Sequence, residues 1–484
     1  MEAFGGPNWA ICTECHGRGK VSQRLKKKVR IAYQQALEAY EKSDPKGIPP
    51  TRPVSHPIVC SSCSGSGLQP TNNKVIVNTE NYPHLAIIGA GIGGVALAVA
   101  CLHRGIPFTL FERDTDFDAR AQGYGLTLQQ ASVAMKGFGI STFEHGVIST
   151  RHVVHTPDGT QIGEWGVRKW LQNEAPKHAR RTNIHIARQL LRASLLEQLG
   201  GSEKIQWGHT LTSMHSCPEK GVELHFQVQG ESKQIHADLV VGADGIRSVV
   251  RKHLIGESVT PLRYLGCLVI LGICSLELLP TIQSELLDGA TVFQTANGHE
   301  RIYIMPFTSD SIMWQLSFPM EENAAKTISL EGKHALKQEA IRRTPWHSPI
   351  PEILNATPEA NISGYPVYDR ELLTPAHFEQ AGSITLLGDA AHPMSPFKGQ
   401  GANQALLDAL TLARTIYKGC RPGTHWCETG LRASVLTEYE HEMLERSAVK
   451  VQDSHDAAQF LHTDVVLYAG DEPRGRVLKR ESSN

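Results

Sequence analysis

The alternation of hydrophobic and polar positions changes character several times along the 484-residue chain, and each change predicts a different element. From Leu85, the stretch LAIIGAGIGGVALAVACLHRGIPFTLFE indicates a short apolar strand, a glycine turn, an apolar helix and a second strand. Residues 205–245, and stretches between about 262 and 318, alternate with a period of two. We therefore expect antiparallel strands in both regions.

Three further segments have strong patterns. SITLLGDAAH predicts a buried strand that leads into a helix beginning near Gly401, and the segment Tyr439–His462 predicts a long terminal helix. Near the start of the chain, Val21–Ser43 is rich in helix formers, and the prolines and glycine that follow must end that helix. The 15-residue apolar run from Leu265 is too short for a membrane helix and predicts a buried strand.

Composition and charge narrow the class of protein. A formal net charge of -1 gives no overall attraction to nucleic acid, and we expect neither a nucleic-acid partner nor a membrane span. Residues 1–75 nevertheless hold eleven Lys or Arg against five Asp or Glu. This basic segment predicts a docking face for an acidic protein partner, and a solvated helix face is the alternative. Six of the ten cysteines show no framework spacing, which favours a reducing, cytoplasmic location.

A glycine motif lies at the first strand-to-helix junction. Gly89, Gly91 and Gly94 form G-x-G-x-x-G, and Glu112 closes the next strand 23 residues after Gly89. The glycines permit a tight turn and close approach to a pyrophosphate, the helix N-terminus faces that anion, and the acid reaches ribose hydroxyls. The motif predicts dinucleotide binding, although NAD(P) and FAD proteins share it.

Two later motifs favour FAD. One is DLVVGADGIRSVVRK, which contains Asp244, Arg247 and Arg251, and the other is ITLLGDAAHPMSPFKGQGANQALLDAL. With GAGIGG, in this order, they resemble the class A flavoprotein monooxygenases, the FAD-dependent aromatic hydroxylases built like para-hydroxybenzoate hydroxylase. The resemblance runs from about Leu85 to Leu461. FERDTDFDARAQGYGLTL and NIHIARQLLRASLL are most similar to the branch that contains the tetracycline-inactivating monooxygenases.

The resemblance implies a set of cofactor-binding residues. Glu112 would bind the adenosine ribose with Arg113 beside it, Arg188 would lie near the FAD, and Asp389 would lie near the ribityl chain. The full set that we expect is Gly89, Gly91, Gly94, Glu112, Arg113, Arg188, Asp244, Gly388, Asp389, Pro396, Gly399, Gly401, Ala402 and Asn403. The Pro396–Asn403 loop would wrap the isoalloxazine.

Some of these residues have a second interpretation. Asp244 lies either near the pyrophosphate or NADPH, or simply caps the following turn. Arg247 and Arg251 either belong to the cofactor site or are surface charges. We expect His392 to form hydrogen bonds within its loop. No residue is assigned a catalytic role.

The resemblance also implies a reaction. NADPH or NADH would reduce FAD, and a flavin hydroperoxide would then hydroxylate a planar aromatic, polyketide or antibiotic-like molecule. The substrate would lie between the flavin and the antiparallel sheet, with Phe293, Tyr303, Met305, Trp314 and Phe318 either lining the pocket or filling the core. The alternative function is a redox-gated flavin protein whose N-terminal module recruits a partner.

Together these patterns predict an α/β fold. A Rossmann-like FAD-binding domain, an antiparallel-sheet substrate domain and a long C-terminal helix would follow a small zinc-binding module. The boundaries that we expect are 1–80 for the module, 81–256 with 364–430 for the FAD-binding domain, 257–363 for the substrate domain, and 431–484 for the helix and tail.

The module contains two copies of C-x-x-C-x-G-x-G, one with Cys12 and Cys15 and the other with Cys60 and Cys63. They resemble the zinc-binding repeats of DnaJ-type co-chaperones. Four thiolates suit a tetrahedral Zn²⁺ with no open position, which predicts a structural role. The zinc would clamp the ends of the basic helix Val21–Ser43. Free thiols, or a redox C-x-x-C pair, are the alternatives.

Overall fold

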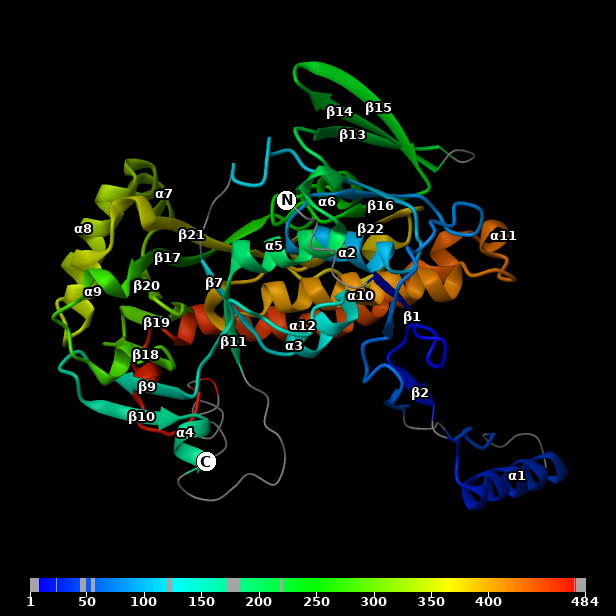
Figure 1. The fold of residues 1–484 in the computed structure, drawn as a ribbon, viewed down its shortest axis with the longest axis horizontal. Coiled ribbons are helices and arrows are strands. Elements are labelled where there is room, and N and C mark those ends of the chain that lie inside the picture. Colours follow the sequence, from blue (N-terminus) through cyan, green and yellow to red (C-terminus); the bar gives the residue numbers. More distant parts are fainter. Residues whose placement is uncertain are drawn as a thin grey trace.

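The computed structural model describes residues 8–22, 24–43, 49–53, 57–119, 124–171, 183–217, 221–473 and 475. In Figure 1, two long helices, α10 (Gly401–Gly419) and α12 (Thr437–Phe460), cross the middle of the molecule side by side. A large sheet with its helices lies on the left, and the N-terminal module lies at the lower right. No helix among the described residues is long and apolar enough to cross a membrane.

A parallel sheet carries the dinucleotide motif. Its strands, in spatial order, are β12 (Ile205–Gln206), β6 (Phe108–Phe111), β5 (Leu85–Ile88), β16 (Leu239–Gly242) and β22 (Ile384–Leu386). All residues of β5 and β16 are buried, as expected for strands covered on both faces. Helix α2 (Ile92–Leu102) packs against α10 and α5 (Arg188–Leu199). The Rossmann-like prediction is therefore confirmed.

Two small antiparallel sheets flank this core. One contains β13 (Thr210–Cys217), β14 (Gly221–Val228) and β15 (Glu231–Ala237), which confirms antiparallel strands for this part of residues 205–245. The prediction was wrong for β12 and β16, which lie in the same region but belong to the parallel sheet. The small sheet packs on the parallel sheet through Phe226, whose ring stacks on Phe111 at 4.5 Å between centroids. The other contains β7 (Gly125–Leu128), β11 (Ile184–Ala187) and β8 (Val147–Ile148).

The large sheet has seven strands within the described residues. They are, in spatial order, β10 (Gln161–Trp165), β9 (Arg151–His155), β18 (Thr291–Ala296), β19 (Arg301–Thr308), β20 (Ser311–Pro319), β17 (Leu262–Ser275) and β21 (Ile362–Arg370). The apolar run from Leu265 lies in β17, which confirms a buried strand. The sheet thus includes β9 and β10, which lie outside residues 257–363, and β21, which extends beyond that range. The domain boundaries themselves stay a prediction.

Helices cover one face of this sheet. α7 (Glu322–Glu331), α8 (Lys333–Arg343) and α9 (Ile350–Ala356) lie on its outer side in Figure 1. The indole of Trp314 fills the space above Gly272, where a Cβ atom would collide with the ring. The other α-helices that the structure describes after residue 83 are α3 (Ala131–Ala134), α4 (Val167–Leu171), α6 (Val249–Ile255) and α11 (Trp426–Leu431).

The N-terminal module consists of two short ribbons and a helix. β1 (Asn8–Ile11) pairs with β4 (Leu68–Thr71), and β2 (Lys20–Ser22) pairs with β3 (Pro57–Val59). Helix α1 (Lys27–Lys42) therefore begins later than the predicted Val21, because that segment is paired as a strand. No residue of α1 is buried, and the helix projects away from the body in Figure 1. Docking of an acidic partner on it stays a prediction.

Candidate active site and metal centre

The glycine turn after β5 is packed too closely for side chains at two of its three positions. Gly89 has φ +101, and a Cβ atom there would lie 2.6 Å from the carbonyl oxygen of Ala243. A Cβ atom on Gly94 would collide with the Gly89 carbonyl. A Cβ atom on Gly91 would lie 3.9 Å from its nearest neighbour, a guanidinium nitrogen of Arg188, so this position faces open space. The turn therefore brings the backbone of α2 to the edge of a cavity without obstruction.

Glu112 and Arg192 hold this turn in place. The Glu112 carboxylate accepts hydrogen bonds from the backbone N–H groups of Ala90, at 2.7 Å, and Asp114, at 3.1 Å. Nε of Arg192 donates to the carbonyl oxygen of Ala90 at 2.8 Å. Both polar backbone groups of Ala90 are thus fixed. Sequence reasoning missed Arg192, which lies one helical turn after Arg188 on α5 and could have been identified from that spacing.

The GADGIRSVVR motif forms a turn that is capped by its own acid. The Asp244 carboxylate accepts from the Ser248 hydroxyl and from the N–H groups of Val249 and Val250. Asp244 therefore caps α6, and its contact with a cofactor stays a prediction. Burial raises the pKa of this carboxyl, and these hydrogen bonds act in the opposite direction.

The two arginines of this motif have different environments. Arg247 is exposed to the cavity, whereas Arg251 is only 2% exposed. Arg251 donates to the carbonyl oxygens of Ala390 and Ala391, at 3.0 and 2.8 Å. It ties this motif to the GDAAH motif, so a surface position is wrong for Arg251.

The GDAAH turn is held by a fully buried carboxylate. Asp408, on α10, accepts from the Gly388 N–H at 2.8 Å, pairs with Nε2 of His392 at 2.7 Å, and accepts from Arg446 at 2.7 Å. Burial acts to raise the pKa of Asp408, but His392 and Arg446 hold it below its ordinary value. Asp408 therefore remains a carboxylate that joins the turn after β22, α10 and α12 at one point. The expectation that His392 forms loop hydrogen bonds is consistent with this contact.

Asn403 organises the loop before α10. Its side-chain oxygen accepts from the N–H groups of Gln129, at 2.8 Å, and Ala131, at 3.2 Å. Its nitrogen donates to the carbonyl oxygens of Thr127 and Gly399, at 2.8 and 2.9 Å. Every polar atom of this buried side chain is used within the protein. Asn403 thus positions the loop, and a direct contact with the cofactor stays a prediction.

A single cavity of about 960 Å³ joins these motifs. The predicted residues that line it are Gly91, Arg188, Gly388, Asp389, Pro396, Gly399, Gly401 and Ala402. The predicted residues that do not line it are Gly89, Gly94, Glu112, Arg113, Asp244 and Asn403. The first group provides the wall of the cavity. Of the second, all except the exposed Arg113 support the turns that form that wall.

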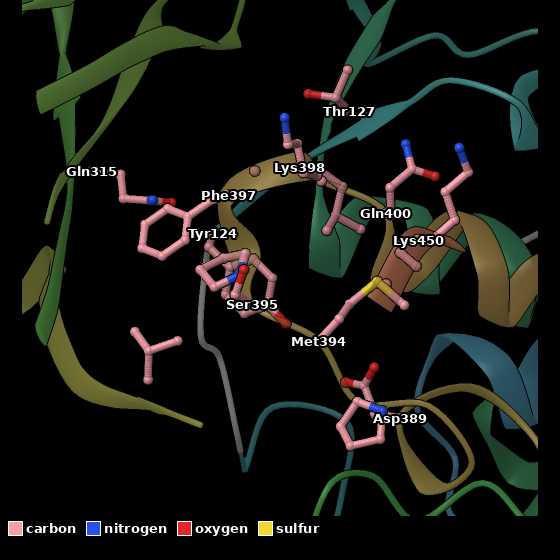
Figure 2. A pocket seen from close by; sticks show the side chains of 18 of the residues that line it. Tyr124, Thr127, Gln315, Asp389, Met394, Ser395, Phe397, Lys398, Gln400 and Lys450 are labelled. Carbon is pink, nitrogen blue, oxygen red and sulfur yellow. The ribbon is translucent and has the colours of Figure 1, made fainter. Parts of the chain in front are cut away.

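Asp389 faces this cavity from below the loop Met394–Lys398 (Figure 2). Its carboxylate is accessible from the cavity but is otherwise enclosed by protein. Burial raises its pKa, while His392 and Arg188 act to lower it. The guanidinium of Arg188 lies 5.6 Å from the centroid of the Tyr124 ring, which lines the same wall. A ligand group bound in the cavity can therefore reach the Asp389 carboxyl directly.

The opposite wall is one face of the large sheet. Its side chains include Gln294 from β18, Tyr303 and Met305 from β19, and Met313 and Gln315 from β20. Figure 2 shows Phe397 extending from the loop toward Gln315. Of the proposed pocket residues, Tyr303 and Met305 line the cavity, whereas Phe293, Trp314 and Phe318 belong to the core beneath the helices. Because successive side chains of a strand point to opposite faces of the sheet, the residues that line the cavity and the residues of the core lie on different faces.

Arg301 is a buried cation on this wall. It is 6% exposed, and its Nε donates to Gln294 at 2.8 Å. Its guanidinium lies 5.1 Å from the centroid of the Tyr303 ring. Burial lowers the pKa of Arg301 to about 10. Among the described residues, no carboxylate forms an ion pair with it.

Comparison with known proteins places the chain in a family. Residues 83–454 match the family described as FAD binding domain, FAD_binding_3. The chain belongs to this family, and it is an FAD-dependent monooxygenase. It is 30% identical to the aurachin C monooxygenase/isomerase of Stigmatella aurantiaca, over 68% of this chain and 79% of that protein. It is 27% identical to the 6-hydroxynicotinate 3-monooxygenase of Bordetella bronchiseptica, over 78% of this chain and 92% of that protein.

Solved structures confirm the fold of this monooxygenase. HpxO of Klebsiella pneumoniae, complexed with FAD and uric acid, has a TM-score of 0.63 at 20% identity, covering 83% of this chain and 92% of that one. The tetracycline destructase Tet(51) has a TM-score of 0.57 at 17% identity, and the match covers 84% of this chain and 96% of that one. The resemblance to that branch therefore extends to the fold.

The cavity of the monooxygenase fits FAD. The close packing at Gly89 and Gly94 and the open position at Gly91 leave the N-terminus of α2 free to face a pyrophosphate. A second helix N-terminus, that of α10, opens on the same cavity through Gly401 and Ala402, and no side chain caps it. Two positive helix ends on one cavity suit a cofactor with an anionic centre and an electron-accepting ring.

The four cysteines of the N-terminal repeats form a separate centre. All are buried, and their sulfur atoms lie within 4.8 Å of one another. Sγ of Cys12 is 3.9 Å from that of Cys60, and Sγ of Cys15 is 3.7 Å from that of Cys63. A tetrahedron with metal–sulfur bonds of about 2.3 Å separates its sulfurs by roughly 3.8 Å. These distances fit a shared metal ion and are far longer than a disulfide of about 2.05 Å.

Backbone donors complete this centre. The N–H groups of Gly19 and Gly67 each donate to a cysteine sulfur at 3.2 Å, to Cys15 and Cys63 respectively. Both glycines have positive φ, at +70 and +81, where a side chain would be strained. The glycines of the repeat therefore turn the backbone toward the sulfurs.

The Asp408 network yields a prediction. In Asp408→Asn the fully buried charge that pairs with both His392 and Arg446 is lost, although the partly exposed Arg446 keeps its ion pair with Glu442. We expect a loss of about 3 kcal/mol in stability and weaker flavin retention. Thermal unfolding followed by flavin fluorescence measures both. Asp456→Asn, which removes an exposed charge from α12, is the matched control and should behave as the unaltered protein does. Equal thermal midpoints for the two variants would contradict the role given to Asp408.

Proposed function

We propose that this monooxygenase uses NADPH or NADH and O₂ to hydroxylate a planar aromatic, polyketide or antibiotic-like small molecule. The observation that supports this best is the shared cavity. The same space of about 960 Å³ is bounded by Asp389 and the start of α10 on one side and by the sheet residues Tyr303 and Gln315 on the other. A cofactor ring and a planar substrate can therefore meet face to face within it.

Bound FAD would supply the redox chemistry, accepting a hydride from the nicotinamide and activating dioxygen. The start of α10 directs the positive end of the helix dipole at the cavity, which favours negative charge on a ring bound there. The chain contains one G-x-G-x-x-G motif, which leaves the nicotinamide without a Rossmann domain of its own. This arrangement suits a reductant that binds transiently.

Apolar side chains would keep water from the reacting atoms. Met305 and Met313 from the sheet, Phe397 from the loop, and Tyr365 from β21 line the middle of the cavity. Burial raises the pKa of Tyr365. A dry cavity strengthens electrostatic contacts and limits side reactions with water.

The substrate carries an anionic group, a carboxylate or an acidic phenol, that pairs with Arg301. A buried guanidinium without a carboxylate partner is costly unless a ligand supplies the charge. The Nε donor of Arg301 is used by Gln294, and no protein acceptor among the described residues bonds the two Nη groups, which leaves a bidentate donor for the ligand. A relative named for hydroxynicotinate, an aromatic acid, agrees with this charge.

A substrate panel tests the proposal. Each aromatic acid would be compared with its neutral amide, with NADPH and NADH oxidation measured and products analysed by mass. We expect a stimulated rate with some acids and a product heavier by one oxygen atom. Unstimulated oxidation across a broad panel would instead favour a redox-gated flavin protein that recruits a partner through its N-terminal module.

Arg301 can be tested with any acid that the panel identifies. In Arg301→Gln, loss of a charge-assisted pair worth about 1.5–3 kcal/mol should raise KM for the acid roughly 10-fold to 100-fold. KM for the neutral amide should change little, and Arg301→Lys should recover part of the loss for the acid. An equal effect on acid and amide would show that Arg301 only supports the sheet.

The cysteine centre is proposed to hold a structural Zn²⁺. Its support is the set of four buried sulfurs at tetrahedral spacing with two N–H donors. We expect one zinc per chain by elemental analysis, and none in Cys12→Ser/Cys60→Ser. Cys427→Ser, at an exposed cysteine, is the matched control and should retain the metal. Retention of zinc by the double variant would contradict a four-thiolate site.

A further inference from the structure

Two arginines of the FAD-binding region lie beneath the N-terminal module. Arg104, just after α2, is 3% exposed, and Arg414, on α10, is partly buried. Among the described residues, neither pairs with a carboxylate. Nε and Nη2 of Arg104 and Nε of Arg414 are buried without a hydrogen-bond acceptor. Buried cations with unused donors imply that an anion is part of the assembled structure.

The cysteine centre is the group that faces them. Nη2 of Arg414 donates to the carbonyl oxygen of Ser66, inside the second repeat, at 3.1 Å. The same atom would lie 3.3 Å from a Cβ atom placed on Gly19, in the first repeat. Burial lowers the pKa of Arg414, and the nearby thiols of Cys15 and Cys63 act to raise it. Arg414 therefore reaches both repeats at once.

Arg104 extends this contact on the same side. Its Nη1 donates to the carbonyl oxygen of Ala100, at 2.9 Å, which fixes the guanidinium at the end of α2. Burial lowers the pKa of Arg104 and the like charge of Arg414 lowers it further, while Cys101, Tyr417 and, last, Cys15 act to raise it. Arg104 therefore lies near Arg414, and Arg414 is the arginine that contacts the repeats directly.

The charges balance only when a metal is bound. Four thiolates around one divalent zinc carry a net charge of -2, whereas four protonated thiols carry none. Two guanidinium groups carry +2. We propose that Arg104 and Arg414 form a cationic seat for the metal-loaded cysteine centre, so that zinc locks the N-terminal module onto the FAD-binding region.

Packing around the seat agrees with a built interface. The indole of Trp9 occupies the space above Gly139, where a Cβ atom would collide with it. Leu410 of α10 packs against Gly137, and the Ser66 carbonyl lies beside them. The module therefore docks on a surface formed by the end of α2, the turn Met135–Phe138 and α10. The module itself lies outside the residues that match the family, which begin at residue 83.

The metal and the seat can be tested separately in the full-length protein. Zinc affinity would be measured by competition with a chromophoric chelator in the unaltered chain, Arg414→Gln, Arg414→Lys and Arg104→Gln/Arg414→Gln. Loss of groups beside the ligands should weaken zinc binding roughly 10-fold to 100-fold in the glutamine variants, with a smaller loss in the lysine variant. Lys418→Gln, one turn further along α10 and exposed, is the control and should bind zinc normally.

Hydrogen exchange gives a readout that does not depend on turnover. Removal of zinc by the chelator, or the Arg414→Gln change, should speed exchange in Met135–Gly139 and in the C-terminal half of α10. Visible absorption of bound FAD confirms that each variant is folded, and Arg414→Gln alone carries the test if the double variant is not.

The inference rests on the proposed zinc centre, and different experimental results would contradict the zinc centre and the arginine seat. Absence of zinc from the unaltered protein would overturn the centre and the seat together. Normal zinc affinity in the glutamine variants, or unchanged exchange after metal removal, would overturn the seat alone.

Discussion

The buried carboxylate of Asp408 is the contact on which the arrangement of this monooxygenase depends. It neutralises Arg446 of α12, pairs with His392, and accepts the backbone N–H of Gly388. Because a buried charge tolerates few geometries, these bonds set the positions of three elements relative to one another. The turn that presents Asp389, the helix end that opens on the cavity, and the long C-terminal helix are therefore placed together.

Much of the fold follows from local patterns in the chain. The buried strands of the parallel sheet, the glycine turn and the start of α10 were predictable because short apolar runs and glycines have few compatible structures. The N-terminal ribbon was not, because Lys20–Ser22 is paired with Pro57–Val59, a contact that helix propensity does not encode. Strands β9 and β10 joined the large sheet through a parallel pairing that is also non-local.

The site shows the same division between local and tertiary information. Motif residues at the wall of the cavity, such as Asp389 and Gly401, were identified from the sequence. Arg301 was not, because an arginine on a strand reveals its role only through what surrounds it. Arg104 and Arg414 are further examples, since their unused donors are visible only when the module is docked. In each case a buried cation pointed to a partner that sequence alone does not supply.

Cofactor and substrate are proposed to share the cavity between α10 and the large sheet. A crystal structure of the FAD-bound protein would decide whether they do. We expect the isoalloxazine against Pro396–Ala402, with its open face toward Tyr303, Gln315 and Arg301. A ring placed away from the N-terminus of α10, or separated from Arg301 by protein, would show that the shared cavity is wrong.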